Sequence, residues 1–227
     1  MMRGFVLAAL AASVVFAAEE TPDARLQRSA EVFNEIMSTP DKGIPTDLLN
    51  KAQCVVIIPG MKKGAFIVGG EFGKGFAECR TATGWTGPAA VKLTGGSFGF
   101  QVGGSSTDLV LLVMNQHGMQ RLTGDKFTLG ADASAAAGPV GRTAAADTDA
   151  SMTAEILSWS RTKGAFAGVS LDGAALQTDQ SENRRLYGHD VSNKEIIEGN
   201  VPPPAAGAVL TSALSSYPGA GNADRTK

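Results

Sequence analysis

Glycine residues interrupt a run of β-forming sequence at irregular intervals. The chain has 28 glycines among 227 residues, and those between residues 60 and 104 stand among valine, leucine and phenylalanine residues. Because the glycines have no fixed period, neither collagen nor a flexible linker fits. Glycine inside strands is typical of bulges, tight bends and close backbone approach. The pattern therefore predicts a strongly curved sheet or a partial barrel.

The other patterns place helices at both ends of the chain and strands between them. Short apolar runs bounded by glycine or proline predict strands at residues 54–58, 65–68, 75–80, 89–93, 97–102, 109–114, 151–160 and 165–171. Helical spacing predicts helices at residues 23–38, 46–52, 117–123, 181–187, 193–198 and 208–216, with Thr46 as the N-cap of the second. We therefore expect an α+β fold: a curved, mostly antiparallel β-sheet or partial barrel with flanking helices at both ends.

The first predicted helix is amphipathic. Leu26, Ala30, Phe33, Ile36 and Met37 fall on one face at helical spacing. This face either packs on the core of the domain or contacts a membrane. The sequence favours core packing and leaves membrane contact as the alternative.

The N-terminus has the pattern of a cleavable secretory signal. Arg3 provides the positive charge, residues 4–16 are apolar, and Val15 and Ala17 are the small residues that predict cleavage after Ala17. The apolar run is shorter than the roughly 20 residues of a membrane-spanning helix. We expect a signal peptide at 1–17, one domain at 18–216 and a disordered tail at 217–227. The protein is then exported, periplasmic or secreted, and peripheral to a membrane.

Charge and cysteine content narrow the function further. The formal net charge of −2 argues against nucleic-acid binding, which needs a basic surface. Cys54 and Cys79 are the only cysteines, and an oxidising compartment favours a disulfide between them. If Cys54 begins one strand and Cys79 ends the next but one, a flat meander separates them too far, whereas barrel curvature brings them together. Both outcomes stay open. With only His117 and His189 beside them, we expect neither a metal site nor a cofactor.

Several motifs follow one another along the chain. They are Leu49-Asn50-Lys51-Ala52-Gln53, Lys63-Gly64-Ala65-Phe66, Gly84-Trp85-Thr86-Gly87-Pro88-Ala89, Gly99-Phe100-Gln101-Val102-Gly103-Gly104, Thr107-Asp108-Leu109-Val110, Ala137-Gly138-Pro139-Val140-Gly141-Arg142, Thr162-Lys163-Gly164-Ala165-Phe166-Ala167-Gly168-Val169-Ser170-Leu171, Asn183 and Tyr187-Gly188. In this order they resemble the SYLF domain family of lipid-binding proteins and actin regulators, and the resemblance covers about residues 25–216. Thr86, Thr162 and Ala165 are mild departures from the family pattern.

The resemblance implies binding of phospholipid head groups, phosphoinositides in eukaryotic members, and no catalysis. Some members also bind actin, often beside a Src-homology or zinc-finger module. This sequence shows neither module, and an exported protein is not expected to meet actin. The resemblance fixes neither the lipid nor the oligomeric state.

Lipid binding needs cations that meet phosphate and an apolar edge that enters the interface. Two groups of candidates emerge, one beside Phe66 and Phe72 and one later in the chain: Lys62, Lys63 and Lys74, then Arg142, Arg161 and Lys163. Taken alone, each cation is a solvated surface charge, and only the resemblance favours a binding role. Our hypothesis is that Lys62 and Lys63 form a basic patch for anionic lipid with Arg161 and Lys163.

Two other functions compete with lipid binding. Gly95-Gly96-Ser97-Phe98-Gly99 matches the G-x-S-x-G motif of serine hydrolases, and Asp108 with His117 or His189 would complete a triad. That motif requires a helix after the serine, whereas residues 100–104 continue a β-like pattern and end in Gly-Gly, so we do not expect an enzyme. The small residues at 131–141 suit a structural or protein-interaction module of the cell envelope.

Overall fold

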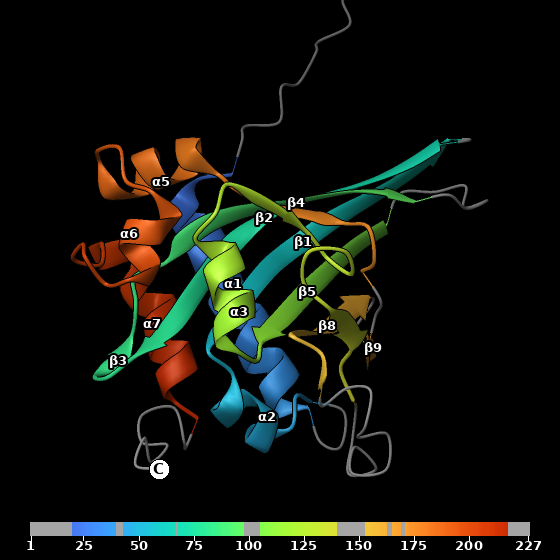
Figure 1. The fold of residues 1–227 in the computed structure, drawn as a ribbon, viewed down its shortest axis with the longest axis horizontal. Helices are drawn as coiled ribbons and strands as arrows, with labels where there is room; N and C mark the ends of the chain where they lie inside the picture. The colour runs from blue at the N-terminus through green and yellow to red at the C-terminus, as the bar shows by residue number, and fades with distance from the viewer. Residues whose placement is uncertain are drawn as a thin grey trace, which may run out of the picture.

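A computed structural model describes residues 20–39, 43–66, 68–97, 105–139, 153–162, 165–168 and 171–217, and the statements below concern these residues. Ten strands form a curled half-barrel with helices at both ends of the chain (Figure 1), which confirms the α+β prediction. The helices are α1 (Pro22–Ser38), α2 (Thr46–Lys51), α3 (Gln116–Leu122), α5 (Gln180–Tyr187), α6 (Asn193–Ile197), the 3-10 turn η2 (Ala205–Gly207) and α7 (Ala208–Ser215). None of the described helices has both the length and the apolar character of a membrane span.

The sheet is mostly antiparallel, as expected. Its strands are β1 (Cys54–Phe66), β2 (Val68–Thr81), β3 (Gly84–Trp85), β4 (Ala89–Ser97), β5 (Ser105–Val113), β6 (Lys126–Thr128), β7 (Ala135–Ala137), β8 (Ile156–Thr162), β9 (Ala165–Gly168) and β10 (Ala175–Thr178). The order across the sheet is β6-β10-β4-β2-β1-β5-β8-β7, with β3 paired to β2 and β9 to β8. Only β7 and β8 pair in parallel among the described strands.

Strands β1 and β2 form one long hairpin, where the sequence predicted three short strands. The register of this pair shifts between Ile57 and Lys62, so Pro59-Gly60 is a bulge inside a strand and not its end. Gly75 shows why glycine is needed in the bend, since a Cβ there would lie 1.9 Å from the carbonyl oxygen of Ile57. The glycines therefore allow curvature and close approach, as their distribution predicted.

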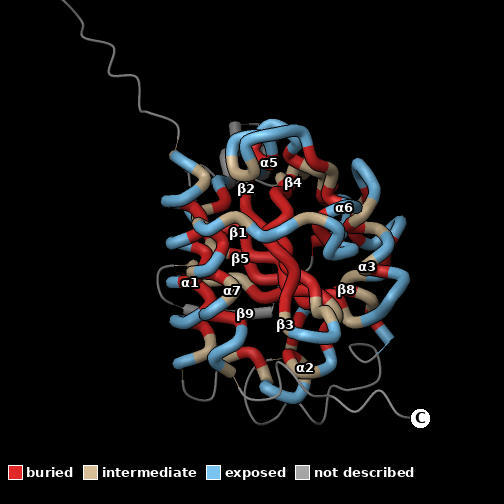
Figure 2. Tube along the Cα trace, turned by 90° about the vertical axis from the view of Figure 1, so that its left-hand side faces the viewer, coloured by how far each residue is buried: buried red, intermediate tan, exposed pale blue. Residues whose placement is uncertain are grey.

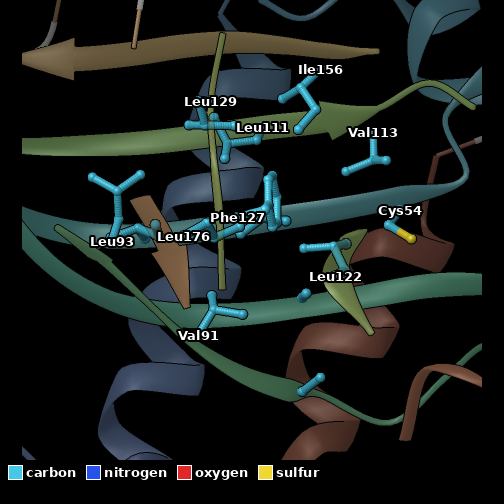
Figure 3. Close-up of a cluster of buried hydrophobic side chains, with 14 of the residues drawn as sticks. Cys54, Val91, Leu93, Leu111, Val113, Leu122, Phe127, Leu129, Ile156 and Leu176 are labelled. Carbon is cyan, nitrogen blue, oxygen red and sulfur yellow. The ribbon is translucent and has the colours of Figure 1, made fainter. Parts of the chain in front are cut away.

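The hydrophobic core lies on both faces of the sheet (Figure 2). On the inner face, side chains from β1, β4, β5 and β10 meet residues of α3 and β6 (Figure 3). Ile196 and Ile197 of α6 belong to the same cluster. On the outer face, α1 and α7 cover β1, β2 and β5. Leu26, Phe33 and Ile36 of α1 are at most 1% exposed, and each contributes roughly 1.5–3 kcal/mol by burial. The apolar face of α1 therefore packs on the core, and the membrane alternative for this helix is excluded in this conformation.

Cys54 and Cys79 form a disulfide, and their Cα atoms are 3.9 Å apart. The two residues are direct neighbours across β1 and β2, so the assumption that an intervening strand separates them was wrong. The backbone N–H and C=O of Cys79 both bond to Thr86, on the side away from β1. The cysteines thus face each other at a position without hydrogen bonds between them, where cross-strand side chains come closest.

Smaller differences concern element ends. Thr46 is the first residue of α2 and Pro45 is its N-cap, without a side-chain cap bond. Strand β10, which joins β4 to β6, was not predicted, because its four residues carry too little periodicity. The signal sequence, most of the predicted tail and residues 98–104 and 140–152 lie outside the described residues.

Candidate functional site

The predicted cation Lys62 and the aromatic Phe72 are neighbours on the hairpin. They are register partners on β1 and β2, so their side chains lie on the same face of the sheet. Lys62 is exposed. Phe72 is 47% exposed and is the one exposed large hydrophobic side chain in the described part of the chain. An open cation therefore stands beside an open aromatic ring at one end of the sheet.

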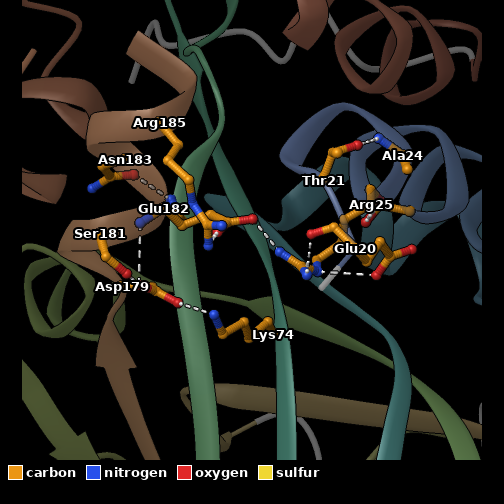
Figure 4. Close-up of polar contacts among 12 residues, drawn as sticks. Glu20, Thr21, Ala24, Arg25, Lys74, Asp179, Ser181, Glu182, Asn183 and Arg185 are labelled. Carbon is orange, nitrogen blue, oxygen red and sulfur yellow. Dashed lines mark hydrogen bonds and ion pairs between the residues drawn. The ribbon is translucent and has the colours of Figure 1, made fainter. Parts of the chain in front are cut away.

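Lys74 lies two residues after Phe72 on β2, and so on the same face of the sheet, at the border of the helical layer. Its Nζ is 3.3 Å from Oδ2 of Asp179, the residue that caps α5 (Figure 4). Burial of Asp179 opposes ionisation, but a hydrogen bond from Ser181 and the charge of Lys74 outweigh it, so the pKa of Asp179 lies below its usual value. Lys74 thus has a structural role in addition to its predicted one.

Arg161 of β8 is held by two carboxylates. Its guanidinium donates to Oδ2 of Asp108 at 2.6 and 2.9 Å and forms an ion pair with Glu35 of α1. The other oxygen of Asp108 accepts from the backbone N–H of Gly60 at 2.8 Å. This cluster joins α1 to β1, β5 and β8. Arg142 and Lys163, and the side chain of Lys63, lie outside the described residues. The predicted basic patch of Lys62 and Lys63 with Arg161 and Lys163 therefore stays a prediction.

A buried ion pair that the sequence did not reveal fixes the first helix to the last third of the chain. Arg25 of α1 pairs with Glu182 of α5, and their side chains are 6% and 1% exposed (Figure 4). Glu20 also pairs with Arg25 and with Arg28, while Arg185 pairs with Glu182. A buried carboxylate is stable only when paired, so this network holds α1 in place.

Glu78 of β2 is a second buried acid, and it has no cation beside it among the described ion pairs. Burial raises the pKa of Glu78 to about 8, although a hydrogen bond with Thr211 of α7 acts in the opposite direction. The Thr211 hydroxyl lies 2.9 Å from Oε2 of Glu78 and 3.2 Å from the carbonyl oxygen of Gly207. Thr211 donates to this Oε2, whereas Oε1 of Glu78 is buried without a hydrogen-bond partner among the described residues, so the site does not satisfy an ionised Glu78. Burial, followed by the charge of Glu78, also raises the pKa of Tyr187.

Several motif residues have structural roles. Asn183 accepts from the N–H of Ala90 at 2.8 Å and donates to Asn193 at 2.7 Å, which ties α5 to β4 and α6. A Cβ on Gly138 would lie 2.1 Å from the ring of Trp159, whose indole N–H donates to the carbonyl oxygen of Pro139. The motifs that carry the family resemblance therefore specify packing at these positions.

Among the described residues, the predicted triad of the hydrolase motif is not assembled. Ser97 is the last residue of β4, and the following segment lies outside the described residues. Asp108 is engaged by Arg161 and Gly60, and His117 bonds to Glu155 instead. Across the described residues, no group of three or more His, Cys, Asp or Glu side chains could hold a metal ion.

The fold and the site define an α+β domain with a curled sheet and an open cation–aromatic pair at one sheet end. A family model for Ysc84, described as Las17-binding protein actin regulator, matches residues 94–217, more than half of the chain. The chain belongs to this Ysc84 family, whose domain is the SYLF domain, and the predicted resemblance is confirmed.

Curated relatives agree with this assignment. An SH3 domain-containing protein of Schizosaccharomyces pombe is 38% identical over 177 residues, which cover 76% of this chain and 41% of that protein. Protein YSC84 of Saccharomyces cerevisiae is 34% identical over 192 residues, 82% of this chain and 41% of that protein. Human SH3 domain-containing YSC84-like protein 1 is 32% identical over 189 residues, 82% of this chain and 55% of that protein. The match therefore spans about half the length of these relatives.

Proposed function

We propose that this protein binds anionic phospholipid at a membrane surface and catalyses no reaction. The observation that carries the proposal is the exposed pair of Lys62 and Phe72 on neighbouring strands. A lysine near an anionic membrane contributes about 1 kcal/mol of attraction, and an aromatic ring beside it can enter the interface. Membership of the SYLF family, whose members include lipid-binding proteins, supports the same function.

We place this activity outside the cytoplasm, in the periplasm or the extracellular space. The signal pattern at residues 1–17 supports export, and the Cys54–Cys79 disulfide suits an oxidising compartment. The matching family model is described as Las17-binding protein actin regulator, but an exported protein is not expected to use actin as its partner. N-terminal sequencing of protein recovered outside the cytoplasm should begin at Ala18, and an uncut Met1 there would contradict the proposal.

Vesicle co-sedimentation tests lipid binding directly. Purified protein should pellet with vesicles of phosphatidylglycerol and phosphatidylcholine and stay in solution with phosphatidylcholine alone. Binding should weaken as ionic strength rises, because salt screens exposed charges. Equal pelleting with both vesicles and no effect of salt would contradict binding to anionic head groups, as would no pelleting at all. A panel of anionic lipids in the same assay identifies the preferred head group.

The alternative is a structural or protein-interaction module of the cell envelope. Strand β7 (Ala135–Ala137) supports it, because this short strand of alanines ends the main order of the sheet. An edge strand of small residues can pair with a strand of another protein. Light scattering of the purified protein measures self-association. Quantitative capture of an envelope protein, together with absence of vesicle binding, would favour this alternative.

A further inference from the structure

A row of lysines crosses four strands of the sheet in register. Lys126 of β6 is opposite Gln177 of β10, Gln177 is opposite Lys92 of β4, and Lys92 is opposite Lys74 of β2. Direct cross-strand neighbours share a face of the sheet, so the three lysines point to the same side. The next row contains Phe72 and Lys62. We call this set the lysine face: Lys62, Phe72, Lys74, Lys92 and Lys126.

The lysine face belongs to the outer side of the half-barrel. Val91 and Leu93 on β4, Phe127 on β6 and Leu176 on β10 all lie in the inner core cluster. Because side chains alternate along a strand, Lys92 and its row neighbours face outward. Phe76 and Ala90 face the same way but are buried in the cluster that α1 and α7 cover. The lysine face is thus the part of the outer side that continues beyond these helices.

The charges on this face are largely uncompensated. Lys74 pairs with Asp179, but Lys62, Lys92 and Lys126 form no ion pair with any acid of the described residues. Lys74 and Lys92 are direct neighbours, and like charges at such positions are destabilising. The chain as a whole has a formal charge of −2, so its overall charge does not account for this concentration of lysines. The arrangement suits an external anion.

The dimensions favour an extended anionic surface over a single phosphate. Lys126 and Lys74 are three strand intervals apart, about 14 Å, and the row of Phe72 and Lys62 is roughly 7 Å further along the strands. One phosphate group cannot meet all these cations, whereas a bilayer of anionic lipids presents many phosphates in one plane. The exposed ring of Phe72 adds an apolar contact for the interfacial region.

We infer that the lysine face is the surface with which this protein docks on an anionic bilayer, with Phe72 entering the interface. The inference rests on the proposed function and names the surface that performs it. It adds Lys92 and Lys126, which the sequence did not single out, and it assigns docking to the open sheet and not to the apolar face of α1, which is buried.

The test reverses charges on two surfaces and compares vesicle binding. Lys92→Glu with Lys126→Glu should weaken binding to vesicles of phosphatidylglycerol and phosphatidylcholine by on the order of 10- to 100-fold, since each lysine contributes about 1 kcal/mol. Lys51→Glu with Lys194→Glu is the matched control, because it changes the net charge equally on α2 and α6. The control should bind within about threefold of the parent. Unfolding curves verify that both variants are folded.

Insertion of the aromatic residue has its own readout. Trp85 and Trp159 are at most 9% exposed, so in Phe72→Trp the new indole is the solvent-accessible one of the three. Its emission should shift to the blue on addition of anionic vesicles, and lipids brominated on the acyl chain should quench it. A Phe72→Trp protein that binds vesicles without either change would overturn the insertion of Phe72.

The outcomes separate the inference from the proposed function. If the parent protein does not bind anionic vesicles, the proposed function itself fails. If the parent binds and both double variants bind equally well, phospholipid binding stands and the lysine face is wrong. The inference would also be overturned if the parent bound a 20-base-pair DNA duplex more tightly than vesicles at the same salt concentration, and if Lys92→Glu with Lys126→Glu abolished that DNA binding. Selective loss of vesicle binding in that variant supports it.

Discussion

Among the described residues, the outer side of the sheet has two regions that differ in whether charged side chains are buried with a partner or left without an acidic partner. Under α1, α5 and α7, ionisable groups are buried and are either paired or neutralised: Arg25 with Glu182 as an ion pair, and Glu78 through a pKa raised to about 8. Beyond the helices, Lys62, Lys92 and Lys126 have no acidic partner in the described part of the chain. Helix packing excludes water and so demands pairing or neutralisation, whereas the open sheet keeps its charge available.

The largest effect on stability should come from the covered region. Arg25→Met leaves Glu182 buried with only Arg185 beside it, and removing one partner of a buried pair costs roughly 3–5 kcal/mol in the free energy of unfolding. Arg28→Met, whose side chain is 45% exposed, should cost less than about 1 kcal/mol. Urea unfolding measures both, and equal losses would show that the buried pair does not hold α1.

A pH-dependent effect should follow from Glu78. The folded chain keeps a proton on this acid up to a pKa of about 8, whereas the unfolded chain releases it near 4.5. Stability from this proton is therefore fully present below pH 4.5 and is lost as pH rises to 8, by at most about 1.4 kcal/mol per pH unit. Glu78→Gln should remove this decline. Unfolding at pH 5, 6.5 and 8 checks it, and parallel profiles of parent and variant would contradict the raised pKa.

An intermediate effect is expected at the border between the regions. Lys74→Met removes the charge opposite Asp179, which is 4% exposed but keeps its bond from Ser181. We expect a loss of about 1 kcal/mol in the free energy of unfolding. The loss should disappear below the pKa of Asp179, where the acid is protonated. Thermal unfolding over a series of decreasing pH values measures the difference, and a loss that persists after Asp179 is protonated would argue against the ion pair.

The smallest effect should come from the open region. Lys92→Ala removes a like-charge neighbour of Lys74 and no described ion pair. Its free energy of unfolding should therefore lie within about 0.5 kcal/mol of the parent, and the change should shrink in 0.5 M salt. A loss above 1 kcal/mol would show that Lys92 stabilises the fold and would end the contrast between the two regions.

Local patterns were sufficient to predict the helices and the general shape of the sheet. Helical spacing, such as that of Leu26 to Ile36, and capping residues are local signals that extend over only a few turns. The predicted bounds of α1, α5, α6 and α7 therefore lie within a few residues of the observed ones. The β1–β2 hairpin was divided wrongly because Pro59-Gly60 resembles a turn while the structure uses it as a bulge. Sequence patterns do not distinguish these two uses of glycine.

The candidate surface was predicted only in part, because it depends on register. Lys62, Lys74 and Phe72 stood out as neighbours in sequence, in Gly-rich segments. Lys92 and Lys126 are separated by more than thirty residues and meet only through β10, a strand that was not predicted. Cross-strand register is a long-range property, and a slip of one residue would place these lysines on the inner face.

The outer core cluster joins the first described helix to the last. Leu26 and Phe33 of α1 pack with Leu210 and Leu214 of α7, and Tyr217 lies edge-on against Phe33 with ring centroids 5.5 Å apart. At translation rates of 5–20 residues per second, synthesis of the chain from α1 to α7 takes roughly 10–35 s. Throughout that interval the apolar face of α1 lacks its final cover. The newborn chain therefore presents to chaperones an apolar helix face that the finished protein conceals.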